Sequence, residues 1–426
     1  GEKSAVNRLI DLVKSADAGR AKIVRLADRW ATWIVVGALV SAAATWFVTG
    51  EVVRAVTILV VFCPCALVLA TPTAVMAAIG NATRRGFLVR AGDALERLAS
   101  VTKVAFDKTG TLTEGRPSVA RVVAVAPFTE TQLLRLAGAI ERLSEHPLGK
   151  AIAAFAQKTL GPSALPPAGD FRMIPGVGVS GTVDGQRIEI GRNAPQNDDG
   201  LETLRAQIEE AGAAGETVSF VIVDAALAGF ITLEDRLRPF SKRVVSELKS
   251  LRVVPVLLTG DREAAARHAA SEVGILSVLS QCRPETKLAY MEREADAGTH
   301  VLMVGDGVND APALKRAAVG VAMGGVGSGI ALEAADIVAV GDRIDGLPDL
   351  IALSRRMMRV IRINLTLAMT INFIAIILAM GGWMGPVVGA LVHNAGSVAV
   401  IIHSASLLGV GKRTGALDAL RAKAAA

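Results

Sequence analysis

Long apolar runs lie near both ends of the chain, and a central body of ordinary polarity separates them. Residues 30–48 are uncharged and apolar, which is about the length that a membrane-spanning helix requires. Residues 52–80 are apolar apart from Arg54, and two further runs occupy residues 365–380 and 386–408. Runs this long and this poor in charge predict four membrane-spanning helices rather than buried core helices.

Basic residues flank these runs on one side, which predicts that residues 81–364 lie in the cytosol. Residues 1–29 place apolar positions at helical spacing between basic ones, as in an amphipathic segment that approaches a membrane. Residues 411–426 are expected to form a cytosolic tail. The net charge of +6 does not indicate a nucleic-acid partner, because the basic residues cluster beside the apolar runs. Three cysteines exclude a disulfide framework.

The central body alternates apolar strands with helical runs in two separated stretches, residues 86–120 and 234–345. This alternation predicts a doubly wound α/β domain. Residues 121–233 lie between the two stretches, with strand-like alternation at 177–190 and 218–231. We therefore expect an α+β insert carried on two connecting strands. The full prediction is membrane α-helical spans (30–85 and 346–410) plus this discontinuous α/β body.

Three of the predicted strands end in carboxylates. Asp107 follows the apolar run 101–106, Asp261 ends the segment Val256 to Asp261, and Asp306 ends the segment Val301 to Asp306. The carboxyl ends of parallel strands share one edge of a sheet, where ligands and chemistry collect. A lone Asp followed by Lys would usually be a polar turn. Together these segments supply a nucleophile, phosphate donors and oxygen ligands for Mg²⁺. The candidate catalytic residues are Asp107, Lys108, Thr109, Thr259, Gly260, Asp261, Lys287, Asn309 and Asp310.

The order of these motifs resembles that of the P-type ATPases, whose phosphorylation domain has the haloacid-dehalogenase fold. The resemblance implies that Asp107 is the phosphorylated residue. It implies that Mg²⁺ is held by Asp107, Thr109 and Asp306. Thr259 and Lys287 would contact the phosphoryl group, and Asn309 and Asp310 would support the Mg²⁺ site. ATP and Mg²⁺ are the expected cofactors.

Residues 141–150 of the insert, which contain Glu141 and the pair His146-Pro147, resemble the nucleotide-binding domain of heavy-metal P-type ATPases. By this resemblance Glu141 and His146 contact adenine. A lone His before Pro is otherwise more often a loop or helix-cap residue. The run from Gly176 to Gly181 matches G-x-G-x-x-G but leads into a strand, so it is not a dinucleotide fingerprint. The expected adenine-binding wall consists of Gly176, Gly178 and Gly191.

Cys63-Pro64-Cys65 interrupts the second apolar run. A proline there removes a helical hydrogen bond, and two thiols beside it offer soft metal ligands. A kinked helix with two small residues is the plainer alternative. The motif resembles the transport site of the heavy-metal branch. The last apolar run lacks the sequence patterns usual in the family's copper transporters and the Asp-x-Gly pattern of its zinc and cadmium exporters, and it has His393 at the corresponding place. His403 is interpreted as a polar residue at the end of the span.

These residues predict the later part of a heavy-metal-exporting P-type ATPase, embedded in a bacterial or archaeal plasma membrane. The transported ion, bound by Cys63, Cys65 and His393, is expected to be divalent, with Zn²⁺ first and Mn²⁺, Co²⁺ or Cd²⁺ behind it. A Cu⁺ exporter, a membrane-tethered phosphatase and a metal-binding partial pump remain alternatives. Thr49-Gly50-Glu51 has the same sequence as the Thr-Gly-Glu loop of the family's actuator domain, but it lies in a predicted turn between two spans and is interpreted as a coincidence. We expect the actuator domain and further membrane helices elsewhere in the full protein.

Overall fold

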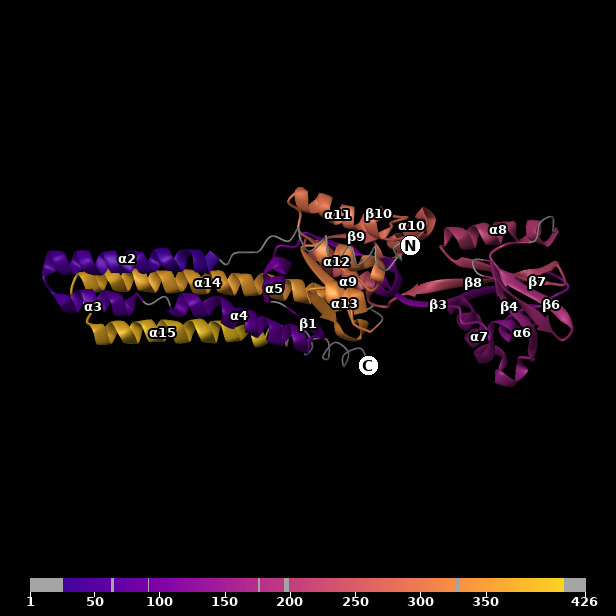
Figure 1. Ribbon diagram of the computed structural model, residues 1–426, viewed down its shortest axis with the longest axis horizontal. Coiled ribbons are helices and arrows are strands. Elements are labelled where there is room, and N and C mark those ends of the chain that lie inside the picture. Colours follow the sequence, from indigo (N-terminus) through magenta and orange to yellow (C-terminus); the bar gives the residue numbers. More distant parts are fainter. Residues whose placement is uncertain are drawn as a thin grey trace, which may run out of the picture.

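The computed structural model describes residues 26–62, 65–90, 92–174, 177–194, 199–325 and 329–409. Three parts follow one another along the long axis of the molecule (Figure 1). A bundle of helices forms one end, a domain built on a seven-stranded sheet lies in the middle, and a domain built on a six-stranded sheet forms the other end. The predicted combination of helical spans and α/β domains is confirmed.

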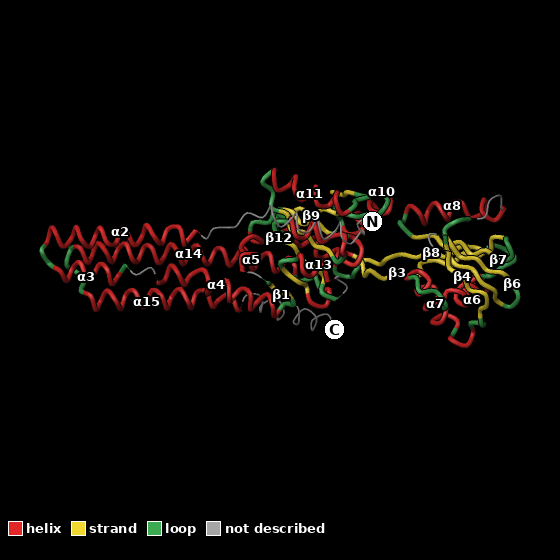
Figure 2. Tube along the Cα trace, in the orientation of Figure 1, coloured by secondary structure: helices red, strands yellow, loops and turns green. Residues whose placement is uncertain are grey.

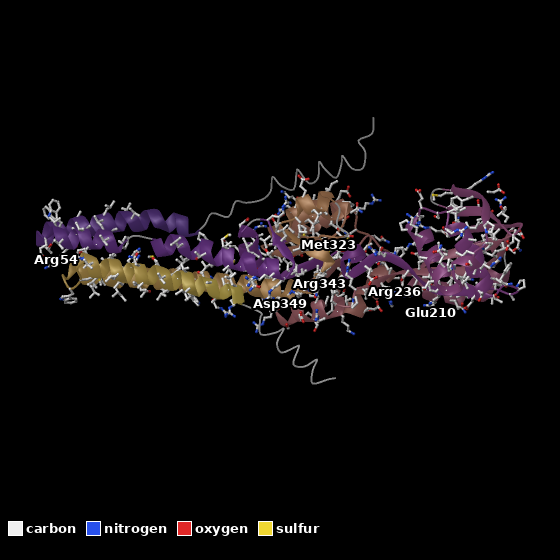
Figure 3. All side chains as sticks on the ribbon, turned by 90° about the horizontal axis from the view of Figure 1, so that it is seen from below. Arg54, Glu210, Arg236, Met323, Arg343 and Asp349 are labelled. Carbon is white, nitrogen blue, oxygen red and sulfur yellow. The ribbon has the colours of Figure 1, made fainter. Side chains whose placement is uncertain are left out.

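Five helices form the bundle, and they appear as long parallel tubes in Figure 2. By length and composition two helices of the described part are able to cross a membrane, namely α14 and α15 with the 3-10 turn that follows it. Side chains along the bundle are mostly carbon, whereas nitrogen and oxygen gather over the two sheet domains (Figure 3). The helices of the bundle are α2 (Leu26–Thr49), α3 (Val52–Val61), α4 (Cys65–Arg84), α14 (Leu347–Met380) and α15 (Pro386–Ala405).

The second apolar run is not one continuous span, which corrects the expectation of two helices between residues 30 and 85. α3 ends at Val61 and α4 begins at Cys65. The sequence between the two helices includes Cys63-Pro64, and a proline interrupts a helix because it has no N–H to donate. Cys63 and Pro64 themselves lie outside the described residues.

The turn between α2 and α3 carries the Thr49-Gly50-Glu51 sequence. Gly50 has a φ of +68°, and Glu51 forms an ion pair with Arg54. Arg54 is labelled at the end of the bundle farthest from the sheets (Figure 3). The turn is therefore remote from Asp107.

α14 begins at Leu347, next to the expected boundary of the C-terminal membrane part at residue 346 and 18 residues before the apolar run at 365–380. Its first part belongs to the core of the seven-stranded domain, where Leu350, Leu353 and Met357 are fully buried. Exposed arginines occupy the other face of this part. One continuous helix thus connects the core of the sheet domain to the bundle.

The seven-stranded sheet has the order β1-β13-β12-β11-β2-β9-β10, and only β1 runs antiparallel to its neighbour. Successive residues of the central strands point into two different cores, Val104 and Phe106 into one and Ala105 into the other. Burial on both faces explains why these strands are apolar throughout. The strands are β1 (Phe87–Val89), β2 (Lys103–Phe106), β9 (Val254–Leu258), β10 (Ser277–Leu279), β11 (Val301–Gly305), β12 (Val319–Met323) and β13 (Ile337–Ala339). The helices around them are α5 (Gly92–Ala99), α9 (Ser241–Ser250), α10 (Glu263–Val273), α11 (Pro284–Asp296), α12 (Ala311–Arg316) and α13 (Gly329–Ala334).

The six-stranded sheet is antiparallel, with the order β3-β8-β7-β6-β5-β4. α6 and α7 share one hydrophobic core with it, and α8 contacts β7 and β8. β3 and β8 run side by side from the middle domain into this sheet (Figure 1). The expected insert boundaries at residues 120 and 233 fall inside these two strands. The elements are β3 (Thr113–Ala124), α6 (Glu130–Glu141), α7 (Pro147–Leu160), β4 (Ala168–Ile174), β5 (Gly178–Val183), β6 (Gln186–Gly191), α8 (Asp199–Ala213), β7 (Thr217–Val223) and β8 (Ala226–Leu237).

Candidate active site and nucleotide pocket

Three neighbouring parallel strands end at the same edge of the seven-stranded sheet, and a candidate site residue follows each. β2 lies between β9 and β11, so the ends that carry Asp107, Thr259 and Asp306 are adjacent. The Asp107 amide donates to the carbonyl of Val304 on β11 at 2.9 Å. That hydrogen bond fixes the first residue of the loop against the neighbouring strand.

Four charged side chains cluster at this edge. Lys287 Nζ, from the first turn of α11, donates to Asp107 Oδ1 at 2.5 Å and to Asp310 Oδ1 at 2.6 Å. Carboxylate oxygens of Asp107, Asp306 and Asp310 all lie within 4.8 Å of one another. Lys287 is 4% exposed and Asp310 is 1% exposed. The structure therefore brings together three carboxylates and one ammonium group.

The surplus of carboxylates is visible in their pKa values. Burial, followed by the charge of Asp310, raises the pKa of Asp107 to about 7 against the attraction of Lys287. Burial and Asp310 also raise the pKa of Asp306 to about 6. Burial alone would lower the pKa of Lys287, but Asp107 and Asp310 outweigh it and raise that pKa above its ordinary value. The single buried cation thus offsets only part of the burial and repulsion that raise the pKa values of Asp107 and Asp306.

This excess of negative charge fits a hard divalent cation. Carboxylate oxygens are the ligands that Mg²⁺ prefers, and it is usually held by one or two carboxylates together with substrate phosphates. Asp107 and Asp306, two of the predicted Mg²⁺ ligands, both belong to the cluster. Thr109, the third, is exposed at its rim. The residues present are therefore suitable for holding Mg²⁺.

Gly110 is required by the geometry of the loop. Its φ is +72°, and a Cβ atom there would lie 1.8 Å from Asp306 Oδ2. No side chain fits at that distance without displacing the carboxylate. The glycine of the Asp-Lys-Thr-Gly sequence consequently allows the loop to approach Asp306.

The other predicted catalytic residues surround the cluster. Lys108 forms an ion pair with Asp261. The buried hydroxyl of Thr259 accepts a hydrogen bond from the Asp261 amide at 3.2 Å, and Gly260 lies between these two residues. Asn309 is exposed on the 3-10 turn before α12. The structure brings Lys108, Thr259 and Asp261 to the sheet edge and leaves Asn309 at the surface.

Two residues that the sequence analysis missed support the loop. Arg238 donates to the carbonyl of Gly110 at 3.0 Å and to that of Thr113 at 2.8 Å. Asp235 Oδ2 accepts a hydrogen bond from the Thr113 hydroxyl at 2.6 Å. Both residues lie at the end of β8, where the chain returns to the seven-stranded sheet. Charged residues at the end of a long apolar strand were the available signal.

A cavity of about 180 Å³ lies beside β5 and β6 in the six-stranded domain. Its size suits a single planar base rather than a whole nucleotide, because ligand pockets are usually larger than about 300 Å³. Of the predicted adenine-binding residues, four line it and Gly176 lies outside the described residues. The four are Glu141, His146, Gly178 and Gly191.

Two of these glycines allow a close backbone contact at the cavity wall. Gly178 on β5 is paired with Gly191 on β6. A Cβ atom on Gly178 would lie 2.0 Å from the Ile190 carbonyl oxygen, and one on Gly191 would lie 2.4 Å from that of Val177. The two glycines therefore allow the strands to approach each other closely, and they present backbone without a side chain at this part of the wall, where a flat ring can approach.

Glu141 is a buried carboxyl group in the same cavity. It is 6% exposed, and its Oε2 has no hydrogen-bond partner among the described residues. Burial raises its pKa to about 7, with a smaller opposing effect from the Ser144 hydroxyl. An unpartnered buried oxygen is costly, and a ligand with a suitable polar edge would satisfy it.

His146 is the N-cap of α7, as well as part of the cavity wall. Its Nδ1 accepts a hydrogen bond from the Leu148 amide at 3.2 Å. In the neutral ring the proton therefore sits on Nε2, which remains available to a ligand. The helix-cap interpretation and the ligand interpretation of this residue are compatible.

A second cavity, of about 890 Å³, lies between the two sheet domains. Lys108, Thr109 and Arg262 line it on the side of the seven-stranded sheet. Leu148 and Arg192 line it on the other side, and both also border the smaller cavity. A ligand with a base in the small cavity would extend its remaining groups toward Asp107 through this space.

The predicted ion ligands in the bundle are only partly described. Cys63 and the side chain of Cys65 lie outside the described residues. His393 is 9% exposed on α15. One turn before it, Gly389 packs so closely on α3 that a Cβ there would lie 2.5 Å from Val61. His393 is thus one helical turn from the place where α15 meets the end of α3.

Comparison with known proteins gives consistent matches. A family model for haloacid dehalogenase-like hydrolases matches residues 102–318. A manganese-exporting P-type ATPase of Mycobacterium tuberculosis is 36% identical over 421 residues, which cover 96% of this chain and 57% of that protein. A probable copper-exporting P-type ATPase V of the same species is 37% identical over 97% of this chain and 54% of its own length.

A crystal structure of a zinc-transporting PIB-type ATPase in the E2.Pi state superimposes with a TM-score of 0.86 at 36% identity. The match covers 95% of this chain and 67% of the solved chain. The present chain spans a little over half of the length of its curated relatives.

Proposed function

The chain belongs to the heavy-metal-transporting P-type ATPases, and from this membership we propose that it exports a metal ion through an aspartyl-phosphate intermediate at Asp107. The observation that carries the proposal is the buried cluster at the sheet edge. It places Asp107 against Lys287, Asp306 and Asp310 in a site that suits a phosphoryl group and Mg²⁺.

Asp107 acts as the nucleophile in this proposal. Lys287 contacts Oδ1, so Oδ2 is left to attack the γ-phosphorus of ATP. A bond forms between Oδ2 and phosphorus, and the bond from phosphorus to the bridging oxygen breaks, with its electron pair leaving on ADP. Lys287 offsets charge on the phosphoryl oxygens, and the Thr259 hydroxyl orients them. Asp107 and Asp306 would hold Mg²⁺, which would supply neutralising charge beside the phosphoryl group.

The six-stranded domain binds the nucleotide in this proposal. The adenine ring fits the small cavity, with Gly178 and Gly191 along its face and Glu141 and His146 at its polar edge. The phosphates then lie in the larger cavity near Lys108 and Thr109. β3 and β8 join the two domains. The hydroxyl of Thr113 on β3 donates to Asp235 on β8, so the position of the nucleotide-binding domain is connected to the phosphorylation loop.

We propose a divalent cargo, with Zn²⁺ ahead of Mn²⁺, Co²⁺ and Cd²⁺. Two thiolates suffice for Cu⁺, but Zn²⁺ needs about four ligands, and His393 is a buried nitrogen donor one turn from the α3 contact. The relatives include manganese, copper and zinc transporters, so their names do not select the ion. Cu⁺ is the alternative.

The bundle is embedded in a membrane, which we propose is a bacterial or archaeal plasma membrane with both sheet domains in the cytosol. Arginines gather where α14 leaves the seven-stranded domain, as the positive-inside rule expects. The opposite end of the bundle carries only the Glu51–Arg54 pair in the described turn.

The ion assignment is tested by ion-stimulated phosphorylation of the intact pump. Zn²⁺ should stimulate most, and His393→Ala should reduce the Zn²⁺ response as strongly as Cys63→Ser does. Ser397→Ala is the matched control, since that hydroxyl donates only to the carbonyl of His393 on the same helix. A Cu⁺ response that exceeds every divalent ion and ignores His393→Ala would contradict the assignment.

A further inference from the structure

A basic pocket of about 550 Å³ lies where the bundle meets the seven-stranded domain. α14 contributes three arginines to its lining, and the end of α15 contributes His403 and Ser406. The arginines are Arg355, Arg356 and Arg359. Nothing in the phosphorylation chemistry or in the proposed ion path uses this pocket.

Among the described residues, the hydrogen bonds and ion pairs of the pocket arginines leave their positive charge without a carboxylate partner. Arg355 donates to the carbonyl oxygens of Leu251 at 2.7 Å and Val101 at 3.0 Å, which are uncharged acceptors. Arg356 and Arg359 are exposed. Within the described part of the chain, no carboxylate forms an ion pair with any of the three.

Another arginine at this junction, unlike those of the pocket, forms an ion pair with a carboxylate. Arg85, at the end of α4, forms an ion pair with Asp349 at 2.7 Å. Asp349 is labelled where the bundle joins the sheet domain (Figure 3). Carboxylates are thus present at this level of the molecule, but the described ones do not pair with the pocket arginines.

Exposed apolar side chains continue from the pocket along the bundle. Ile363 lines the pocket and is 47% exposed, and Leu367, one turn further, is 42% exposed. Arg359, Ile363 and Leu367 are four residues apart, so they lie on one face of α14. On α15, Ile402 precedes the pocket-lining His403 in the sequence and is 66% exposed. Charge at one end followed by an apolar stripe matches the layout of a phospholipid.

We propose that this pocket binds the phosphate of an anionic phospholipid in the leaflet that faces the sheet domains. Arg356 and Arg359 donate to the phosphate oxygens, and the acyl chains follow Ile363 and Leu367. Basic pockets between membrane helices attract anionic headgroups through charge and hydrogen bonding. The proposal depends on the position of the bundle in a membrane and not on the pumping activity.

Native mass spectrometry of the full chain in detergent tests this, with phosphatidylglycerol and phosphatidylcholine titrated separately. Phosphatidylglycerol should bind in preference. The variant Arg356→Gln/Arg359→Gln should bind it roughly thirtyfold more weakly, since each basic residue contributes about fivefold. The control Arg84→Gln/Arg362→Gln removes the same charge from exposed sites at the same junction that do not line the pocket. It should stay within about twofold of wild type.

Equal weakening in both double variants would overturn the proposal, because it would mean diffuse attraction to the whole junction. Equal binding of phosphatidylcholine would overturn it as well. Inorganic phosphate serves as the tail-free competitor. If it displaces phosphatidylglycerol at equal concentration, the pocket is an anion site without lipid recognition. ATP-dependent labelling of Asp107 in each variant separates a failure of this proposal from a failure of the proposed function.

Discussion

Asp107 and Glu141 are both buried carboxyl groups with a pKa of about 7, but their surroundings differ. Around Asp107 burial acts together with Asp310, and Lys287 opposes both. Glu141 lies in a cavity where burial acts with no cation against it, and one of its oxygens has no partner in the described chain. The first site is organised by charge and the second by shape. Removing the charge of Lys287 should therefore destabilise the first site, whereas removing the charge of Glu141 should stabilise the second.

The largest expected effect is the loss of the buried cation. Lys287→Met leaves Asp107 and Asp310 without their shared partner, which should lower the free energy of unfolding by about 3–5 kcal/mol. Cys282, a buried free thiol in the same domain, reports the unfolding through its reaction with a thiol reagent during a urea titration. Cys63→Ser/Cys65→Ser provides a background with no other thiol.

A double variant distinguishes the ionic cause from a packing defect. Lys287→Met combined with Asp310→Asn should recover part of the lost stability, because one uncompensated carboxylate is removed. Strictly additive losses would show that Lys287 acts only through packing, and the charge-organised view of this site would fail.

The next effect concerns the approach of the loop to Asp306. Gly110→Ala should reduce phosphorylation by about a hundredfold, because the new Cβ displaces the Asp306 carboxylate. Gly298→Ala is the control: its φ is also +72°, but nothing lies within 4 Å of its Cβ position. Measurement of ATP-dependent labelling separates the two causes. Similar losses in both variants would assign the effect to backbone strain alone.

The smallest effect belongs to the nucleotide cavity and has the opposite sign. The pKa of Glu141 is raised from 4.5 to about 7, so its neutral form is preferred in the folded protein. Stability from this group is complete below pH 4.5 and is lost as the pH rises through about 7. At pH 8, Glu141→Gln should therefore be more stable than wild type, by at most about 3 kcal/mol.

Hydrogen exchange of the β5 and β6 amides measures this difference at pH 5 and pH 8. The gain should shrink at pH 5, where the wild-type carboxyl is already neutral in the folded state. An equal gain at both pH values would mean that the substitution improves packing, and the comparison with Asp107 would lose its basis.

The sequence predicted the strand ends well, for a local reason. Each of the strands before Asp107, Asp261 and Asp306 is a short apolar run, and parallel strands bring their carboxyl ends together wherever they are in the sequence. Asp107 and Asp306 were placed in one site on this basis, whereas Lys287, which lies on α11 and 180 residues from Asp107, was added from the resemblance. The cavity glycines Gly178 and Gly191 came from family resemblance rather than from periodicity.

What the sequence did not predict depends on long-range packing. The contact of Arg238 with Gly110 joins residues 128 positions apart, and the charged end of β8 indicates a polar site there without indicating its partner. The C-terminal membrane part was expected from residue 346, but the packing of the first part of α14 in the core of the sheet domain, through Leu350 and Leu353, was not predicted. The sequence predicted a loosened helical turn at Pro64 but not two helices that end at Val61 and begin at Cys65. Local rules do not distinguish a kinked helix from two helices.

The central claim is that Asp107 is the residue phosphorylated by ATP. Incubation of the full chain with γ-labelled ATP and Mg²⁺ tests it directly, followed by acid quenching and treatment with hydroxylamine. We expect an acid-stable label that hydroxylamine removes, and no label on Asp107→Asn. Equal labelling of Asp107→Asn would contradict it.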